Sequence, residues 1–578
     1  MLLSCKLFEC FIRKYDRRKI ELFSPAFSCL HLDSKSALNV LQSKLTLPLR
    51  IPMTVKQGFT LLSIAVPAVL VLLSLIWLPF LWGFLVILPI IVLGLWDITQ
   101  RKKTLLRLYP IIGHFRYFLE SVRPEIQQYF IESDTNGKPI SREFRNLVYQ
   151  RAKGDRDTRP FGTVFDVYRT GYEWINHSLA PSKVLEQNPR IIFGSLHCSQ
   201  PYAASPLNIS AMSYGALSKT AIMALNKGAK AGDFAHNTGE GGVSPYHTKH
   251  GGDLIWQIGT GYFGCRMDDG AFCEEQFAEI AQRKQIKMIE VKLSQGAKPG
   301  HGGILPAAKV TQEIVDIRHV KLGEDVISPP SHSAFSTPKG LLEFIVKLRK
   351  LSDGKPTGFK LCIGHKSEFL SICKAMLETG ITPDFIKIDG GEGGTGASPI
   401  ELTNSVVMPL RDAVSFVNNA LVGVSLRDKI RLVAAGKIIS AFHMVKIIAL
   451  GADTVNSARG MMFALGCIQA RHCNTDACPT GIATQNPTRY QALDVSDKGE
   501  RVAHYHKAMI HHLMDLLAVA GVRSTDDIKP HHIQRRVSEV EVKSYAEIYD
   551  VLQKGDLLST ELPKHWQKDW NLASANAW

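Results

Sequence analysis

Charged side chains are missing from one long stretch near the start of the sequence. Between Phe59 and Trp96, 38 residues contain no Asp, Glu, Lys, Arg or His. A single helix of that length would measure about 57 Å, whereas the hydrocarbon core of a bilayer is about 30 Å thick. A break near residues 77–79 predicts two shorter helices, over about 61–77 and 80–96, that cross a membrane as a hairpin. A buried hairpin of a soluble domain is the alternative, although such hairpins normally keep a polar face.

The start of the sequence also lacks the marks of a cleaved signal. The segment 1–58 is basic, but "MLLSCKLF" has neither a leading basic region nor a small-residue cleavage site. Met53, just before the apolar stretch 59–97, is an alternative start of translation. Both flanks of the stretch are basic, at Lys56 and at residues 101–103, which predicts that both ends lie in the cytoplasm and that the protein resides in the inner (cytoplasmic) membrane.

An excess of acidic residues and a disulfide framework are absent as well. The net charge is +15, from 68 Lys and Arg against 53 Asp and Glu. The basic residues are spread out, with clusters at 101–107 and 138–159, so we expect contact with anionic membrane lipid and none with nucleic acid. Eleven cysteines in a chain that faces the cytoplasm argue against disulfides and leave open which of them bind a metal.

The region from about 201 to 522 repeats one pattern, in which short apolar, β-branched runs end in glycine or polar residues and helical segments follow. Helical patterns lie at 218–231, 274–285, 337–351, 367–379 and 440–450. The alternation predicts an α/β fold with parallel strands, and a closed (β/α)8 TIM barrel in particular; a doubly wound open sheet is the alternative. The eight candidate strands are 206–212, 233–239, 253–259, 286–292, 358–364, 384–390, 430–436 and 453–459.

The segments on either side of the barrel carry no chemistry that the sequence reveals. We interpret 98–200 as a linker and packing subdomain and 523–578 as a C-terminal extension.

Glycine-rich loops follow several of the predicted strands. In barrels the loops after the seventh and eighth strands commonly hold phosphate, so a phosphate-bearing ligand is expected near Gly436, Lys437, Arg459 and Gly460. Tight turns would explain any one of these glycines equally well. Lys292 lies at the end of the fourth strand, where a partly desolvated amine would meet a bound anion or ring.

Three cysteines follow the eighth strand in the pattern C-x5-C-x4-C, in "GCIQARHCNTDACPTGIATQ". Zinc sites usually have paired C-x2–4-C units and four ligands, and only His472 is nearby to complete a set of four. An iron–sulfur cluster that lacks one corner needs three thiolates. Three free buried thiols are the remaining alternative.

The ordered motifs "SAMSYGALS", "NTGEGG", "QIGTGYFG", "QGAKPGHGG", "ISPPSH" and "GGTGASP", together with the cysteine stretch, make residues 200–522 resemble the FMN-dependent synthase domain of glutamate synthase. The resemblance implies FMN, a [3Fe-4S] cluster on Cys467, Cys473 and Cys478, and reduction of 2-iminoglutarate to L-glutamate. It places Glu240, Gln295 and Lys298 at the substrate, in binding and proton delivery. It places the remaining cofactor residues as follows: Ala211, Met212 and Ser213 along the flavin, Gln257, Lys292 and Lys360 around its ring, and Gly393, Gly394, Thr395, Gly436, Arg459 and Gly460 toward its phosphate.

The sequence departs from this family at several points. An apolar stretch stands where the family has a glutamine-splitting domain, so ammonia, free or derived from glutamine by a separate glutaminase subunit, is the expected nitrogen source. Electrons would come from a donor such as ferredoxin or a reductase subunit. His301 replaces a Glu, and Tyr262 replaces an Arg whose loss would remove a cation near the flavin. Two alternatives stay open: an N-methylglutamate synthase-type subunit with other amine chemistry, and a non-catalytic electron-transfer subunit.

Overall fold

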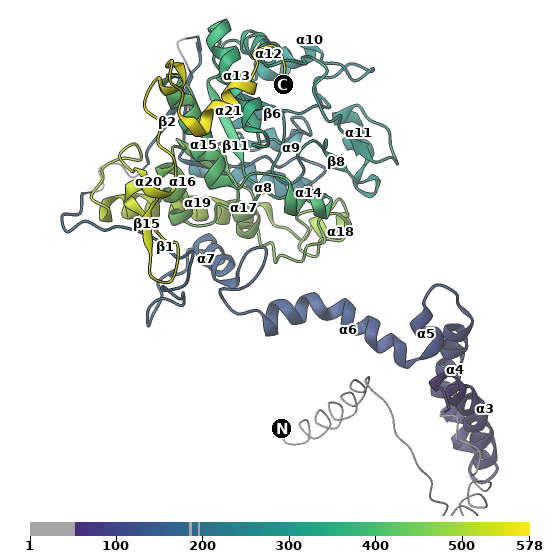
Figure 1. Ribbon diagram of the computed structural model, residues 1–578. Helices are drawn as coiled ribbons and strands as arrows, with labels where there is room; N and C mark the ends of the chain where they lie inside the picture. Colours follow the sequence, from purple (N-terminus) through teal and green to yellow (C-terminus); the bar gives the residue numbers. More distant parts are fainter. Residues whose placement is uncertain (1–52, 184–187, 195–196) are drawn as a thin grey trace, which may run out of the picture. The chain divides into compact units, whose positions relative to one another are not determined.

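The computed structural model describes residues 53–183, 188–194 and 197–578 (Figure 1). Most of the predicted basic N-terminal segment therefore lies outside the described residues. The chain divides into two compact units, which meet between Arg123 and Pro124. This division falls inside the segment 98–200.

The first unit contains the apolar stretch as two helices, α3 (Val55–Ser74) and α4 (Phe84–Thr99). A turn and the 3-10 helix η1 (Leu78–Gly83), with a proline in its first turn, separate them close to the expected break. Together with η1, these helices are long and apolar enough to cross a membrane, and almost none of their residues is buried. The helices α5 (Thr104–Leu108) and α6 (Ile112–Ile126) follow.

The second unit is built on a closed barrel of eight parallel strands, which confirms the predicted α/β barrel and excludes the open sheet. Seven of the eight strands lie inside the ranges expected from the sequence, and the fifth, at 357–361, begins one residue before its range. Around the barrel they are β4 (Leu207–Ile209), β5 (His236–Asn237), β6 (Leu254–Ile258), β7 (Ile286–Lys292), β10 (Thr357–Leu361), β11 (Phe385–Asp389), β12 (Arg431–Ala435) and β13 (Thr454–Ser457).

Helices connect the strands and cover the barrel (Figure 1). Side-chain caps define where several of them begin: Ser218, Thr337 and Ser440 each accept a hydrogen bond from a backbone N–H of the first turn. The helices are α8 (Lys219–Gly232), α9 (Pro245–Thr248), α10 (Glu274–Ala281), α12 (Pro338–Leu351), α13 (Lys366–Thr379), α15 (Leu410–Gly423), α16 (Ala441–Ala449), α17 (Arg459–Ala464) and α19 (Val495–Val519).

An antiparallel pair of short strands, β2 (Ile191–Phe193) and β3 (Tyr202–Ala204), closes the amino-terminal end of the barrel. Phe193 packs edge-on against Phe385 at 5.8 Å between ring centroids, in an apolar cluster with the first inward residues of four strands. Because this end is filled with hydrocarbon, polar chemistry is left to the opposite end.

The C-terminal extension packs on the barrel. The strands β14 (Ile533–Arg536) and β15 (Val542–Ser544) join β1 (Glu173–Ile175) in an antiparallel sheet. Farther on, α21 (Lys564–Leu572) stacks Trp566 on Phe416 of α15, at 5.1 Å between centroids.

Replacing Phe193, which is 1% exposed, by alanine should lower the free energy of unfolding by about 3–5 kcal/mol, because it leaves a cavity under the barrel. Urea unfolding of the detergent-solubilised protein measures the change. Ile192→Ala on the same strand is the matched control, since that side chain is 51% exposed, and it should change stability by no more than about 0.5 kcal/mol. Equal effects of the two substitutions would contradict the packing.

Candidate active site at the barrel mouth

Charged side chains line the inside of the barrel at the carboxyl ends of its strands. Glu290 and Lys292 are two residues apart on β7, and Lys387 and Asp389 are two residues apart on β11. Lys360 lies on β10, between these two strands. All five residues are buried. The Nζ atom of Lys360 lies 3.1 Å from Asp389 Oδ2, and that of Lys387 lies 3.4 Å from Glu290 Oε2. Because side chains two residues apart on a strand point to the same face, the two charges of β7 and the two charges of β11 all face the barrel interior.

A long loop after β7 completes this charged cluster. It contains β8 (Ile304–Leu305), α11 (Gln312–Arg318) and β9 (Val326–Ile327). Lys298 and Arg318 from this loop are 1% and 4% exposed.

Glu240, from the loop after β5, accepts a hydrogen bond of 2.8 Å from Lys292 Nζ. Lys292, Lys298 and Arg318 all act electrostatically on its carboxylate. Three predicted residues, Glu240, Lys292 and Lys298, therefore meet in one place.

The pKa values reflect competition between burial and these neighbours. Burial alone would raise the pKa of Glu240, but Lys292 and the other cations hold it below its ordinary value, so the carboxylate stays ionised. Burial lowers the pKa of Lys298 to about 8 and that of Arg318 to about 10. Burial would also lower the pKa of Lys360, and Asp389 and Glu290 raise it above its usual value.

Positive charge exceeds negative charge in this cluster. Its five cations face three carboxylates, which leaves an excess of two positive charges in a buried place. Buried charges are stable only when they are paired, so the excess fits an anionic ligand with two negative charges. The cations are Lys292, Lys298, Lys360, Lys387 and Arg318, and the carboxylates are Glu240, Glu290 and Asp389.

The predicted Gln295 also lies in this region. Its Nε2 atom is buried without a hydrogen-bond partner, although buried polar groups are normally satisfied. A Cβ atom added to Gly303 would lie 2.3 Å from Glu240 Oε1, so only glycine lets the loop approach this carboxylate. The unpaired donor and the close backbone approach both indicate a place shaped for a ligand.

The residues expected along a flavin lie at the same end of the barrel. Gln257 of β6 is buried and donates to Glu290 Oε1 at 2.5 Å, so it belongs to the charged cluster. Ala211, Met212 and Ser213 form the loop after β4, and Met212 N donates to Asn237 O of β5 at 3.3 Å.

Two cations lie where a phosphate is expected. Arg459 donates to the carbonyl of Glu392, and a Cβ atom on Gly394 would lie 3.4 Å from its guanidinium. Burial lowers the pKa of Lys437, and the nearby Arg459 lowers it further. Two neighbouring cations suit an anion such as phosphate. The other residues expected at the phosphate follow the same three strands. Gly393, Gly394 and Thr395 lie after β11, Gly436 lies after β12, and Gly460 lies after β13.

The two departures from the family pattern lie in different surroundings. His301 is exposed on the loop after β7. Tyr262 is buried among aromatic rings, and its hydroxyl donates to His332 Nδ1 at 3.0 Å and accepts from Ala334 N at 3.1 Å. His332, whose pKa burial lowers to about 4, donates through Nε2 to the carbonyl of Lys292. Tyr262 thus supports the end of β7 from outside the charged cluster.

The cysteine loop follows α17. Cys478 is buried, Cys467 and Cys473 are partly buried, and all three thiols are free. Tyr149 donates to the carbonyl of Cys467 at 2.6 Å. A Cβ atom on Gly396 would lie 3.4 Å from Cys473 Cβ, so the cysteine loop touches the loop after β11. Three non-glycine residues of this loop have φ angles near 60°: Gln469, Arg471 and Asp476. Such strain persists where the surroundings enforce it, commonly at functional sites.

The three thiols influence one another electrostatically. Burial raises the pKa of Cys467 to about 12, and the other two cysteines raise it further. Burial would also raise the pKa of Cys478, but hydrogen bonds from Thr480 and the backbone of Ala483 bring it below its ordinary value. Cys478 is therefore the most readily ionised of the three.

The three cysteine sulfurs do not form a close group of ligands. Within the part of the chain that the structure describes, His511, His512 and Asp515 form the one group of three possible ligands that all lie within 4.8 Å of one another. At least one pair of the three cysteine sulfurs is therefore more than 4.8 Å apart.

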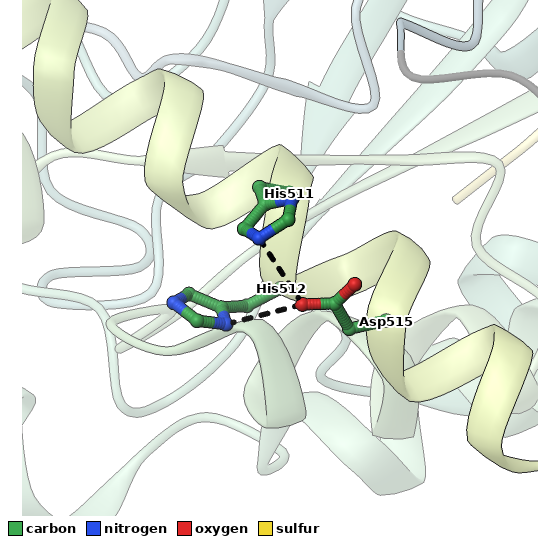
Figure 2. A group of neighbouring side chains, drawn as sticks. All are labelled: His511, His512 and Asp515. Atoms are coloured by element: carbon green, nitrogen blue, oxygen red, sulfur yellow. Dashed lines mark ion pairs between the residues drawn. The ribbon is translucent and has the colours of Figure 1, made fainter. Parts of the chain in front are cut away.

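His511, His512 and Asp515 lie on one turn of α19 (Figure 2). They are not part of the charged cluster. Asp515 Oδ2 lies 3.3 Å from His511 Nε2, and His512 Nε2 lies 2.9 Å from Asp157 Oδ2. His511 is exposed and the other two residues are partly buried, and the ion pairs account for their grouping. We assign no metal to it.

Lys309 joins the cysteine loop to the loop after β7. It is 2% exposed, and its ammonium donates to the carbonyls of Ala216, Cys473 and Ala483 at 3.1, 2.7 and 2.8 Å. Burial lowers its pKa, and Asp476, Cys473 and Cys478 raise it. One cation therefore connects three segments beside the thiols.

Sequence reasoning missed several members of the site. Glu290, Lys387 and Asp389 carry a detectable signal, since charges alternate within apolar strands. His332 ends the motif "ISPPSH", whereas Arg318 and Lys309 carry no signal, because they come from a long loop whose course only the tertiary structure defines.

Comparisons with known proteins show the family to which the chain belongs. A family model described as the conserved region in glutamate synthase matches residues 175–523. The glutamate synthase large subunit-like protein YerD of Bacillus subtilis is 38% identical over 481 residues, which cover 76% of this chain and 91% of that protein. The archaeal glutamate synthase (NADPH) of Methanocaldococcus jannaschii is 34% identical over 326 residues, or 56% of this chain and 61% of that one.

The ferredoxin-dependent glutamate synthase 2 of Synechocystis sp. is 33% identical over 337 residues, which cover 55% of this chain and 21% of that protein. The chain thus matches about three fifths of the archaeal protein and about one fifth of this much longer one. Among solved structures, a mandelate oxidase variant with an FMN adduct aligns with a TM-score of 0.37 and 13% identity, over 75% of this chain and 99% of that one.

Lys309→Met should loosen the cysteine loop, because it leaves three buried carbonyls without a donor, at a cost of about 1–3 kcal/mol for each unsatisfied group. Hydrogen exchange of peptides covering 466–486 measures the effect, and we expect faster exchange there. Lys321→Met on the same long loop is the control, since Lys321 is exposed. Unchanged exchange in Lys309→Met would refute the bridging role.

Proposed function

The chain belongs to the glutamate synthase family and is an oxidoreductase of that type, and we propose that it reduces 2-iminoglutarate, formed from 2-oxoglutarate and ammonia, to L-glutamate. The observation that carries this proposal is the excess of two positive charges in the buried cluster at the barrel mouth. A substrate with two carboxylates compensates that excess, whereas a neutral substrate would leave it unpaired.

Lys298 and Arg318 are the cations best suited to hold the substrate carboxylates. Among the residues that the structure describes, neither has a carboxylate partner within ion-pair distance, whereas Lys292, Lys360 and Lys387 each do. One N–H of Arg318 already donates to the carbonyl of Tyr214 at 2.7 Å, and this hydrogen bond fixes the direction of the guanidinium. The unpaired Nε2 of Gln295 supplies a further donor.

Reduction of the C=N bond requires a proton at nitrogen. Lys298 Nζ, with its pKa near 8, is protonated at neutral pH and can give that proton up, so we assign it as the donor. Glu240 stays ionised beside Lys292 and keeps the local charge balanced when the proton leaves.

FMN fits the residues around the cluster. Gln257, Lys292 and Lys360 would surround its ring, and Lys437 and Arg459 would meet its phosphate, beside Gly436 and Gly460. When bound, FMN supplies hydride transfer and the [3Fe-4S] cluster supplies single-electron transfer. The chain's part is to hold the substrate in one orientation and to exclude water from the buried charges.

We propose that Cys467, Cys473 and Cys478 hold the [3Fe-4S] cluster. The electrostatic effect of the thiols on one another and the ammonium of Lys309 beside them support this assignment. Contact of Cys473 with the loop after β11 brings the cysteine loop next to the proposed flavin site. The electron donor would be a ferredoxin or a reductase subunit, and ammonia would be free or come from a glutaminase partner.

We further propose that α3 and α4 anchor the protein in the cytoplasmic membrane, with the barrel unit in the cytoplasm. Their exposed apolar side chains and the basic residues on both flanks, Lys56 and Arg101 to Lys103, support the anchor.

The purified protein should show flavin and broad iron–sulfur absorption, and it should form L-glutamate from 2-oxoglutarate, ammonia and a chemical reductant. Cys473→Ser should remove the broad absorption and leave the flavin peaks, because it removes one cluster ligand. Cys198→Ser is the control, since that thiol donates to Gly354 O at the far end of the barrel. A colourless protein would sink the cofactor assignment, and a coloured protein that makes no glutamate would sink the proposed reaction.

The kcat/KM for 2-oxoglutarate should fall as the pH rises through about 8. Burial lowers the pKa of Lys298 to about 8, so the amine is charged below this pH and neutral above it, and anion binding and proton donation are both lost. Lys298→Arg should remove this fall, because arginine stays charged, while lowering kcat through loss of the proton donor. An unchanged pH profile in Lys298→Arg would assign the transition to another group.

A further inference from the structure

The helix α6 has an exposed apolar face that none of the described residues of its own unit covers. Ile112, Phe115, Phe118 and Leu119 are 66%, 62%, 58% and 43% exposed. Their spacing of three, four and seven residues places them on one side of the helix. Exposed aromatic side chains at this spacing indicate a surface that meets an apolar environment.

The surroundings of this face are strongly basic. Between residues 100 and 123 the chain has six basic side chains and one acidic one, Glu120. Glu120 lies on the opposite side of α6, whereas Arg116 and Arg123 border the apolar face. The other four basic residues, Arg101, Lys102, Lys103 and Arg107, precede the helix.

Hydrogen bonds tie the start of α6 to the end of α4. Asp97 of α4 is fully buried, and it accepts from Ile111 N at 3.0 Å and from His114 Nε2 at 2.9 Å. Gly113 also approaches Leu106 so closely that a Cβ atom there would lie 2.8 Å from its side chain. The beginning of α6 is therefore held where α4 ends, and if α4 leaves a membrane there, α6 starts at the membrane surface.

We propose that residues 112–123 of α6 form an amphipathic helix that lies in the surface of an anionic lipid bilayer, with its aromatic face among the acyl chains. The inference rests on the proposed membrane anchor. An apolar face with arginines along its edge matches the hydrocarbon boundary and the phosphate groups above it. The basic residues before the helix add attraction to anionic headgroups. A second protein would match the apolar face but would not require six basic residues beside the end of an apolar hairpin.

Photo-crosslinking in the full chain tests this proposal. The photoreactive amino acid p-benzoylphenylalanine would replace Phe118 on the apolar face, Glu120 on the polar face, or Leu72 in α3, in vesicles containing phosphatidylglycerol. After illumination, mass spectrometry identifies what each position has captured. We expect lipid adducts at positions 118 and 72, and about tenfold less lipid adduct at position 120. Position 115 is a second probe of the same face.

The outcomes separate the helix from the anchor. Lipid capture at position 72 without capture at 118 and 115 would overturn the surface helix and leave the anchor standing. Absence of lipid at positions 72, 115 and 118 would overturn the anchor, and with it the inference. Peptide adducts at 118 would identify a protein surface as the occupant and overturn the lipid. Exchange of phosphatidylglycerol for phosphatidylcholine should lower the yield at 118, and an unchanged yield would overturn the anionic preference.

Discussion

Pairing of buried charges is the constraint on which the rest of this structure depends. A charge inside a barrel is tolerated only beside an opposite charge or a dense set of hydrogen bonds, and β7, β10, β11 and the loop after β5 supply three such pairs: Lys292 with Glu240, Lys387 with Glu290, and Lys360 with Asp389. The parallel register sets the three lysines level with one another. Lys298 and Arg318 are the cations that remain, and they are the ones proposed to bind the substrate anion.

The two ends of the barrel divide the work between stability and chemistry. Phe193 and its neighbours fill the amino-terminal end with apolar side chains, so that end needs no ligand to be stable. The carboxyl end instead holds polar groups that a ligand would satisfy, such as the unpaired amide of Gln295. The loop after β7 brings Lys298, Lys309 and Arg318 into this end, and Lys309 links it to the cysteine loop. The cations proposed to bind the substrate and the loop that carries the three thiols thus both depend on the loop after β7.

The replacement at Tyr262 shows how a departure from a family pattern acquires meaning from its surroundings. The sequence indicates a lost cation near a flavin. In the structure, the tyrosine hydroxyl belongs to a short relay through His332 to the carbonyl of Lys292, within an aromatic cluster. Burial keeps His332 neutral, so the relay has a defined direction of donation. The substitution therefore concerns the support of the strand that carries Lys292, and the charges around Glu240 are provided by other residues.

The sequence by itself determined the eight strands, the broken apolar hairpin and the trio of cysteines, because each is written in local pattern: β-branched runs ended by glycine, an uncharged stretch with a proline break, and a short cysteine spacing. It also pointed to Glu240, Lys292 and Lys298, which lie at strand ends or in glycine-rich motifs.

Only the tertiary structure brought Arg318 to Glu240, Lys309 to Cys473, and Asp97 to the start of α6. The first two join residues far apart in the sequence, and all three depend on how irregular backbone crosses other segments. No periodicity encodes such crossings, so the charge balance that defines the site appears only once the chain has folded.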